Sequence, residues 1–137
     1  MATFSRLPGA SELPLVNRYI LILIPLQPYV DWVRGLPNPE HEEGDIELTL
    51  DEAQQYHRTS YLVPYSWDWD EVEEWLDENF DLFFLDQLRG IESDSSLWPT
   101  RSLEVFDSWF EAHIFDAPLD TTREPMFVRP RSKKKRR

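Results

Sequence analysis

The chain has 137 residues and a mass of 16.4 kDa, enough for one compact domain and little more. It contains no cysteine, which excludes disulfide scaffolds, thiolate chemistry and cysteine-based zinc sites. A hydrophobic content of 41%, with 14% aromatic residues, supports a packed core and argues against wholesale disorder, and the formal net charge at pH 7 is −12.

The charge is divided unevenly along the chain. Residues 1–128 contain all 26 acidic residues and only seven of the 14 basic ones, a formal charge of −19. Residues 129–137 (RPRSKKKRR) contain the other seven bases and no acid, a charge of +7. The sequence therefore predicts an acidic body that repels nucleic acid and a basic tail that attracts it.

In the first half of the chain, the sequence predicts a strand that is flanked by flexible or loop segments. Residues 1–16 contain Pro8, Gly9 and Pro14 without periodicity, and we expect a flexible N-terminal arm. Residues 18–26 (RYILILIPL) are apolar at odd and even positions, which favours a central strand covered on both faces, although a short buried helix has the same pattern. Pro25 cannot donate to a ladder, so strand pairing is expected to end there.

Shorter elements follow before the most regular part of the chain. The pattern predicts a short helix over 29–35, an exposed loop over 36–45, another brief helix over 51–56 and a strand over 60–65. The longest apolar run, residues 19–26, is too short to span a bilayer and is not followed by a secretory cleavage site. We therefore expect no membrane span and a cytoplasmic location.

A long amphipathic helix is predicted over residues 68–89. Asp68 followed by Glu71 has the spacing of a capping box, and acidic residues fill the first turn. One face is apolar at helical spacing, through Trp69, Val72, Leu76, Phe80 and Phe83. The opposite face is acidic, through Asp70, Glu74, Asp77, Glu78 and Asp81.

The remaining elements complete the predicted fold. A last helix starts near Thr100 or Ser102, with Leu103, Phe106 and Trp109 on one face, and residues 113–116 are a candidate strand. The order of elements favours an α+β sandwich, with helices packed on a short mixed β-sheet of about three strands. We expect an acidic domain over 17–117 and a disordered C-terminal segment over 118–137.

The segment SLWPTRSLEVFDSWF, residues 96–110, resembles a pattern found in small, acidic, uncharacterised bacterial proteins. In that family a Trp-Pro pair and an arginine precede a helix with a phenylalanine and then Trp-Phe, followed by a strand. The matching positions are Leu97, Trp98, Pro99, Arg101, Phe106, Trp109 and Phe110. The family has no established activity, so the resemblance implies no catalytic residues.

No motif in the sequence indicates catalysis. The histidines, His41, His57 and His113, lack the spacing of a zinc hydrolase motif, and a metal site would require distant segments to converge. No GxSxG elbow or phosphate-binding glycine loop occurs. We predict no catalytic residue, metal or cofactor, and regard an enzyme as the less favoured class.

An acidic interaction surface is the favoured functional hypothesis. Tryptophans outside the helical periodicity, here Trp67 and Trp98, serve either as interface anchors or as lids over a small core. With the carboxylates they define a candidate surface for a basic protein partner, made of Trp67, Asp70, Glu74, Asp77, Asp81 and Trp98. The predicted function is that of a non-catalytic protein-interaction or regulatory protein, with mimicry of nucleic acid as a special case.

The basic tail supports an alternative function. Its bases can bind RNA or DNA through phosphates, bind an anionic membrane surface, or fold back on the acidic body. The alternative hypothesis is therefore a nucleic-acid-associated, RNA-binding protein that uses the tail alone. The residues concerned are Arg129, Arg131, Lys133, Lys134, Lys135, Arg136 and Arg137.

Overall fold

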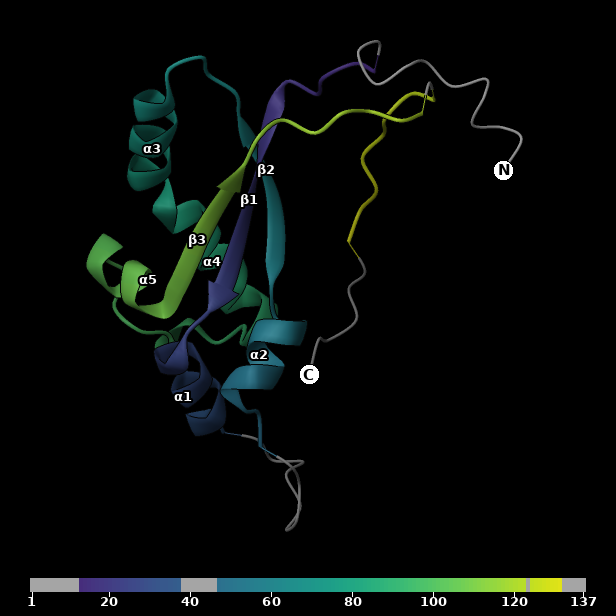
Figure 1. Cartoon of the computed structure of the whole chain (residues 1–137). Helices are drawn as coiled ribbons and strands as arrows, with labels where there is room; N and C mark the ends of the chain where they lie inside the picture. The colour runs from purple at the N-terminus through teal and green to yellow at the C-terminus, as the bar shows by residue number, and fades with distance from the viewer. Residues whose placement is uncertain (1–12, 38–46, 123, 132–137) are drawn as a thin grey trace.

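The structure is a computed structural model in which residues 13–37, 47–122 and 124–131 are described (Figure 1). The elements are β1 (Arg18–Pro25), α1 (Gln27–Gly35), α2 (Leu50–Tyr56), β2 (Thr59–Pro64), α3 (Trp69–Glu78), α4 (Phe80–Ile91), the 3₁₀ helix η3 (Ser95–Leu97), α5 (Leu103–Trp109) and β3 (Phe110–Phe115). The strands form one sheet in the order β2-β1-β3. The predicted α+β class with a sheet of about three strands is confirmed.

Both ladders of the sheet are antiparallel, so it is not a mixed sheet. The reason lies in the connections. The helices α1 and α2 lie at the end of the sheet where β1 stops, and they return the chain to that end for β2 (Figure 1). The helices α3 and α4 then lead the chain back to the same end, so β3 also runs against β1 (Figure 1).

The central strand has two different faces. Its odd-numbered side chains, Tyr19, Leu21, Leu23 and Pro25, are buried, because the helical layer packs on them. The core on this side includes aromatic residues from α4 and α5, of which Phe84 contacts Phe106 and Trp109 at ring-centroid distances of 5.4 and 5.7 Å. The even-numbered isoleucines are only half-buried and lie outside this core cluster. The helices therefore cover one face of the strand more completely than the other.

Specific hydrogen bonds fix the short helices against the end of β1. Pro28 occupies the first turn of α1, and Leu26 N donates to the Trp109 carbonyl at 2.8 Å. Gln54 of α2 donates to the Pro25 carbonyl at 3.2 Å, which uses an acceptor at the point where the ladder stops. Thr49 caps α2 by accepting from Glu52 N at 3.2 Å.

The predicted single helix over 68–89 is wrong, because the chain breaks at Asn79 into α3 and α4. Asn79 leaves the helical conformation, with φ −113° and ψ 17°. Its backbone N–H and its side-chain Nδ2 both donate to the Trp75 carbonyl, at 3.0 and 2.8 Å. Asparagine competes in this way for helix carbonyls, and the competition redirects the chain here. Figure 1 shows the result: α3 stands beside the sheet, whereas α4 runs behind the strands.

The segments that flank the sheet pair with each other. Val16 N donates to the Pro118 carbonyl at 2.9 Å, and Asp120 N donates to the Pro14 carbonyl at 2.8 Å. Leu15 and Leu119 form an antiparallel bridge between these bonds. Within the described residues, no helix is long and apolar enough to cross a membrane.

Candidate interaction surface

The acidic face of α3 is positioned by the residues at its start. Asp68 caps the helix by accepting from Asp70 N at 2.9 Å, as the sequence predicts. Glu71 accepts from Ser66 Oγ at 2.8 Å rather than from the Asp68 backbone, so the capping box is only half formed. Val72 is buried against the core, and three acids of the predicted interaction surface are exposed on α3: Asp70, Glu74 and Asp77.

A groove lies between α3 and α5 on the helical side of the sheet. Its volume is about 190 Å³. The apolar lining comes from the sheet, from α3 and α4, and from α5, and includes Leu21, Leu23, Leu76, Phe80, Leu103 and Phe106. Three exposed carboxylates, those of Glu73, Asp77 and Asp107, also line it. The groove therefore combines an apolar floor with an acidic rim.

One carboxylate of this rim is influenced by another. The pKa of Asp107 is raised, first by partial burial and second by the negative charge of Asp77. These two residues come from α3 and α5, so the fold brings together acids that lie thirty residues apart in the sequence. Among the described residues, no basic side chain lies within ion-pair distance of either carboxylate. The rim thus presents negative charge without a counter-ion from the part of the chain that the structure describes.

Asp81 and Trp98 belong to a different cluster from the other predicted surface residues. Asp81 lies on α4, beyond the break, and its Oδ1 is 3.0 Å from Arg101 Nε. The guanidinium groups of Arg101 and Arg89 lie 5.8 and 5.9 Å from the Trp98 ring centroid. Trp98 is half-buried against the core and donates from Nε1 to the Glu92 carbonyl at 2.8 Å. Asp81 is thus paired with an arginine, whereas the acids of α3 have no ion pair with any arginine in the described ranges.

Trp67 lies in the loop before α3 and is 92% exposed. Its ring packs edge-on against Tyr65 at 5.1 Å, and Tyr65 in turn lies 5.1 Å from Tyr19 of the core. Trp69, which the helical pattern places on the buried face, is 40% exposed and contacts Tyr19 at 5.2 Å. The start of α3 therefore carries an exposed aromatic group supported by the core, next to the acidic face.

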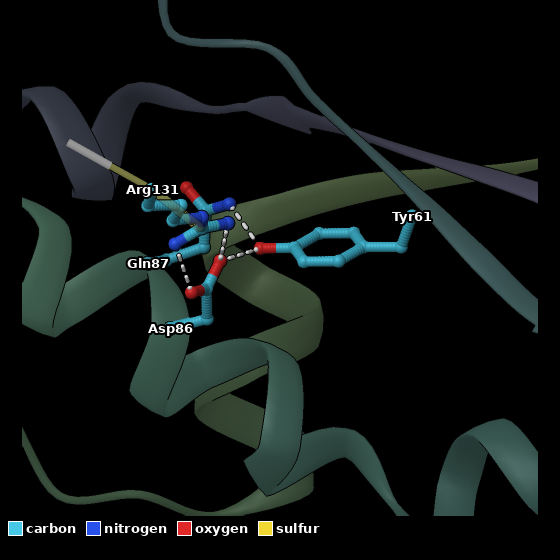
Figure 2. Close-up of polar contacts among 4 residues, drawn as sticks. All are labelled: Tyr61, Asp86, Gln87 and Arg131. Atoms are coloured by element: carbon cyan, nitrogen blue, oxygen red, sulfur yellow. Dashed lines mark hydrogen bonds and ion pairs between the residues drawn. The ribbon is translucent and has the colours of Figure 1, made fainter. Parts of the chain in front are cut away.

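The described part of the basic tail includes one base that contacts the body. Arg131 donates through Nη1 and Nη2 to Asp86 Oδ1 and Oδ2, at 2.7 and 3.3 Å (Figure 2). Arg129 is exposed. The other predicted tail residues, Lys133, Lys134, Lys135, Arg136 and Arg137, lie outside the described residues.

The group that receives Arg131 is a partly buried polar network that the sequence analysis missed. Asp86 also accepts from Tyr61 Oη at 2.5 Å, and Gln87 Nε2 donates to the same hydroxyl at 2.7 Å (Figure 2). Burial and the hydrogen bond to Asp86 raise the pKa of Tyr61 far above its ordinary value of 10.0. The sequence signal was Gln87, a polar residue between Phe83, Phe84 and Leu88 on a buried stripe.

The histidines do not converge on a shared site in the described residues. His57 Nδ1 lies 2.8 Å from Tyr29 Oη, and His113 Nε2 lies 3.4 Å from Glu111 Oε1. His57 lines a second hollow, of about 460 Å³, whose described lining contains no carboxylate. No group of three or more potential metal ligands occurs within residues 13–37, 47–122 and 124–131, and His41 lies outside them.

Comparison with known proteins gives no match. No family model fits the chain, and neither a curated protein nor a solved structure is significantly similar to it.

Proposed function

We propose that this chain is a non-catalytic protein-interaction or regulatory protein that binds a basic partner, in the cytoplasm, through the groove between α3 and α5. The observation that carries the proposal is the opposition of Asp77 and Asp107 above an apolar floor. A lysine or arginine side chain fits this combination, because its aliphatic stem packs on apolar surface while its charged end meets carboxylates. The groove would hold one such side chain of a partner.

The surroundings of the groove support recognition beyond a single side chain. Asp70 and Glu74 continue the acidic face along α3, and Trp67 adds an exposed aromatic group near its start. The charge of −19 over residues 1–128 also attracts a basic partner from a distance and speeds its association. Aromatic anchors next to charged groups are typical of the energetically important part of protein interfaces.

The test uses labelled peptides of nine lysines and nine arginines, with binding followed by fluorescence anisotropy. We expect binding that weakens as salt is added, because the attraction is electrostatic. The double variant Asp77→Asn/Asp107→Asn should weaken binding by roughly tenfold, since it removes two of the three negative charges that line the groove.

A matched control separates the groove from the total charge. Asp51→Asn/Glu124→Gln removes the same two charges from exposed positions outside the groove. This variant should change the affinity by about twofold or less, because only long-range attraction is reduced. Equal losses in both variants would contradict a groove-specific site and leave only diffuse attraction.

A further inference from the structure

The face of the sheet turned away from α4 carries a separate apolar surface, which we call the open face. The register places three side chains level with one another across the strands: Leu62, Ile20 and Phe115. Leu62 and Phe115 are 55% and 51% exposed. Ile22 and Ile24 continue the surface along β1 and are half-buried. Figure 1 shows no described helix in front of these strands.

The open face differs from the rest of the body in its charge. The side chains that its strands turn to this side include one acid, Glu111, and one base, Arg18. The acidic helices α3, α4 and α5 line a groove on the opposite face, over Leu21 and Leu23. Two copies of a chain with a net charge of −12 repel each other in most orientations. Two acidic bodies that meet through the open face therefore bring few carboxylates together.

The arrangement of rows on this face is also self-complementary. Leu62 on β2 and Phe115 on β3 flank Ile20 on opposite sides, and in the next row Ser60 and His113 flank Ile22. A two-fold axis parallel to β1 exchanges the two flanks. It places Leu62 of one copy over Phe115 of the other, with isoleucine over isoleucine between them, and Ser60 over His113. Such an isologous contact is the commonest form of homodimer.

We propose that the open face is a homodimer interface, with the sheets of two copies packed face to face about an axis along β1. Strands β2 and β3 have six residues each, and pairing along that length with the longer β1 gives a face of roughly 15 by 20 Å, at spacings of about 4.8 and 3.3 Å. Such a contact buries less than the roughly 1,200 Å² of a standard stable interface. The dimer is therefore expected to be weak and to form only at high protein concentration.

Sedimentation equilibrium of the full chain over a wide concentration range tests the dimer. The expected result is a monomer–dimer equilibrium that shifts toward dimer between about 50 and about 500 mM NaCl, because salt screens the repulsion between the bodies. Salt should therefore strengthen the dimer but weaken the binding of a basic peptide, so the two proposals can fail independently. A monomer at every concentration and salt would overturn the dimer and leave the face to a different partner.

A pair of variants locates the contact. Leu62→Glu adds a charge within the proposed interface and should raise the dissociation constant by about tenfold or more. Leu82→Glu is the control, because Leu82 lies on α4 and is similarly exposed, at 61%. Both sites are on the surface, so both variants should fold, which circular dichroism checks. Equal dimerisation of the two variants would overturn this interface.

Single cysteines test the orientation, since the chain has no cysteine of its own. Faces packed about 10 Å apart are too distant for a direct disulfide but suit a short bis-maleimide cross-linker. Ile20→Cys should cross-link between copies, because an axis along β1 places this position over itself. Glu74→Cys on α3 should remain monomeric under the same treatment. Absence of cross-linking at position 20, with dimer present, would overturn the proposed axis.

Discussion

The carboxylates at the two edges of the helical layer have opposite electrostatic surroundings. Near β2, Asp86 accepts from Tyr61 and from Arg131, so its charge is compensated. Near β3, partial burial and then the negative charge of Asp77 raise the pKa of Asp107, and neither carboxylate has a described basic neighbour. A compensated carboxylate supports the fold, whereas an uncompensated pair costs folding free energy and gains from an external cation. The difference distinguishes a structural acid from a recognition site in a chain with 26 acidic residues.

The largest effect is expected from removing the compensated carboxylate. Asp86→Ala leaves Tyr61 and Arg131 without their shared acceptor and should reduce the free energy of unfolding by about 1–3 kcal/mol. Urea unfolding measures the change. Asp51→Ala, at an exposed position on α2, is the control and should alter stability by less than about 0.5 kcal/mol. A loss no greater than the control's would show that the network near β2 is not structural.

Neutralising one acid of the groove should have the opposite effect on stability and raise the free energy of unfolding. Asp77→Asn removes the charge that faces Asp107 and should stabilise the fold by about 0.2–0.5 kcal/mol at low salt, a size typical of exposed charge pairs. The gain should shrink as salt rises, because screening already weakens the repulsion. Urea unfolding at two salt concentrations measures it. Destabilisation by Asp77→Asn would mean that the two edges do not differ in the way described.

The pH dependence of the groove is the smallest and most specific effect. The pKa of Asp107 is raised in the folded protein, so the folded state binds its proton more tightly than the unfolded state does. This residue therefore destabilises the fold above its folded pKa, and the penalty is relieved as the pH falls through that pKa. The contribution of Asp94 to stability has the opposite pH dependence, because hydrogen bonds from Ser96 lower its pKa.

Carboxyl NMR titration resolves the two causes of the Asp107 shift. In Asp77→Asn the pKa of Asp107 should fall but stay above its ordinary value, because burial is the larger cause. The pKa of Asp94 should not change in the same variant and serves as the internal reference. An unchanged pKa of Asp107 would show that the charge of Asp77 does not act on Asp107.

The fold was largely predictable because its signals are local. Helix starts at Asp68 and Ser102 follow from capping chemistry, and the apolar run of β1 identifies the central strand. The break at Asn79 was not predicted, because it depends on one side chain competing for a carbonyl inside an otherwise regular pattern. Periodicity describes the face of a helix and is insensitive to a change in its direction.

The candidate site was predictable only in part, because its key pairs are distant in sequence. The acids of α3 were identified from their helical spacing, but the approach of Asp107 depends on how α5 packs beside α3. The pair of Arg131 and Asp86 joins positions 45 residues apart. Neither pairing leaves a spacing signal, so residue type and composition could identify the participants but not their partners.

The bonds between the flanking segments have a mechanical consequence. Val16 pairs with Pro118 at the same end of the sheet where β1 begins and β3 ends. A force that pulls residues 13 and 120 apart would load these bonds one after another. It would then separate β3 from β1, one hydrogen-bonded pair at a time. Antiparallel neighbours opened from one end resist weakly, because each step breaks only one or two hydrogen bonds. The domain should therefore yield at low force along this axis and expose the core beneath β3 first.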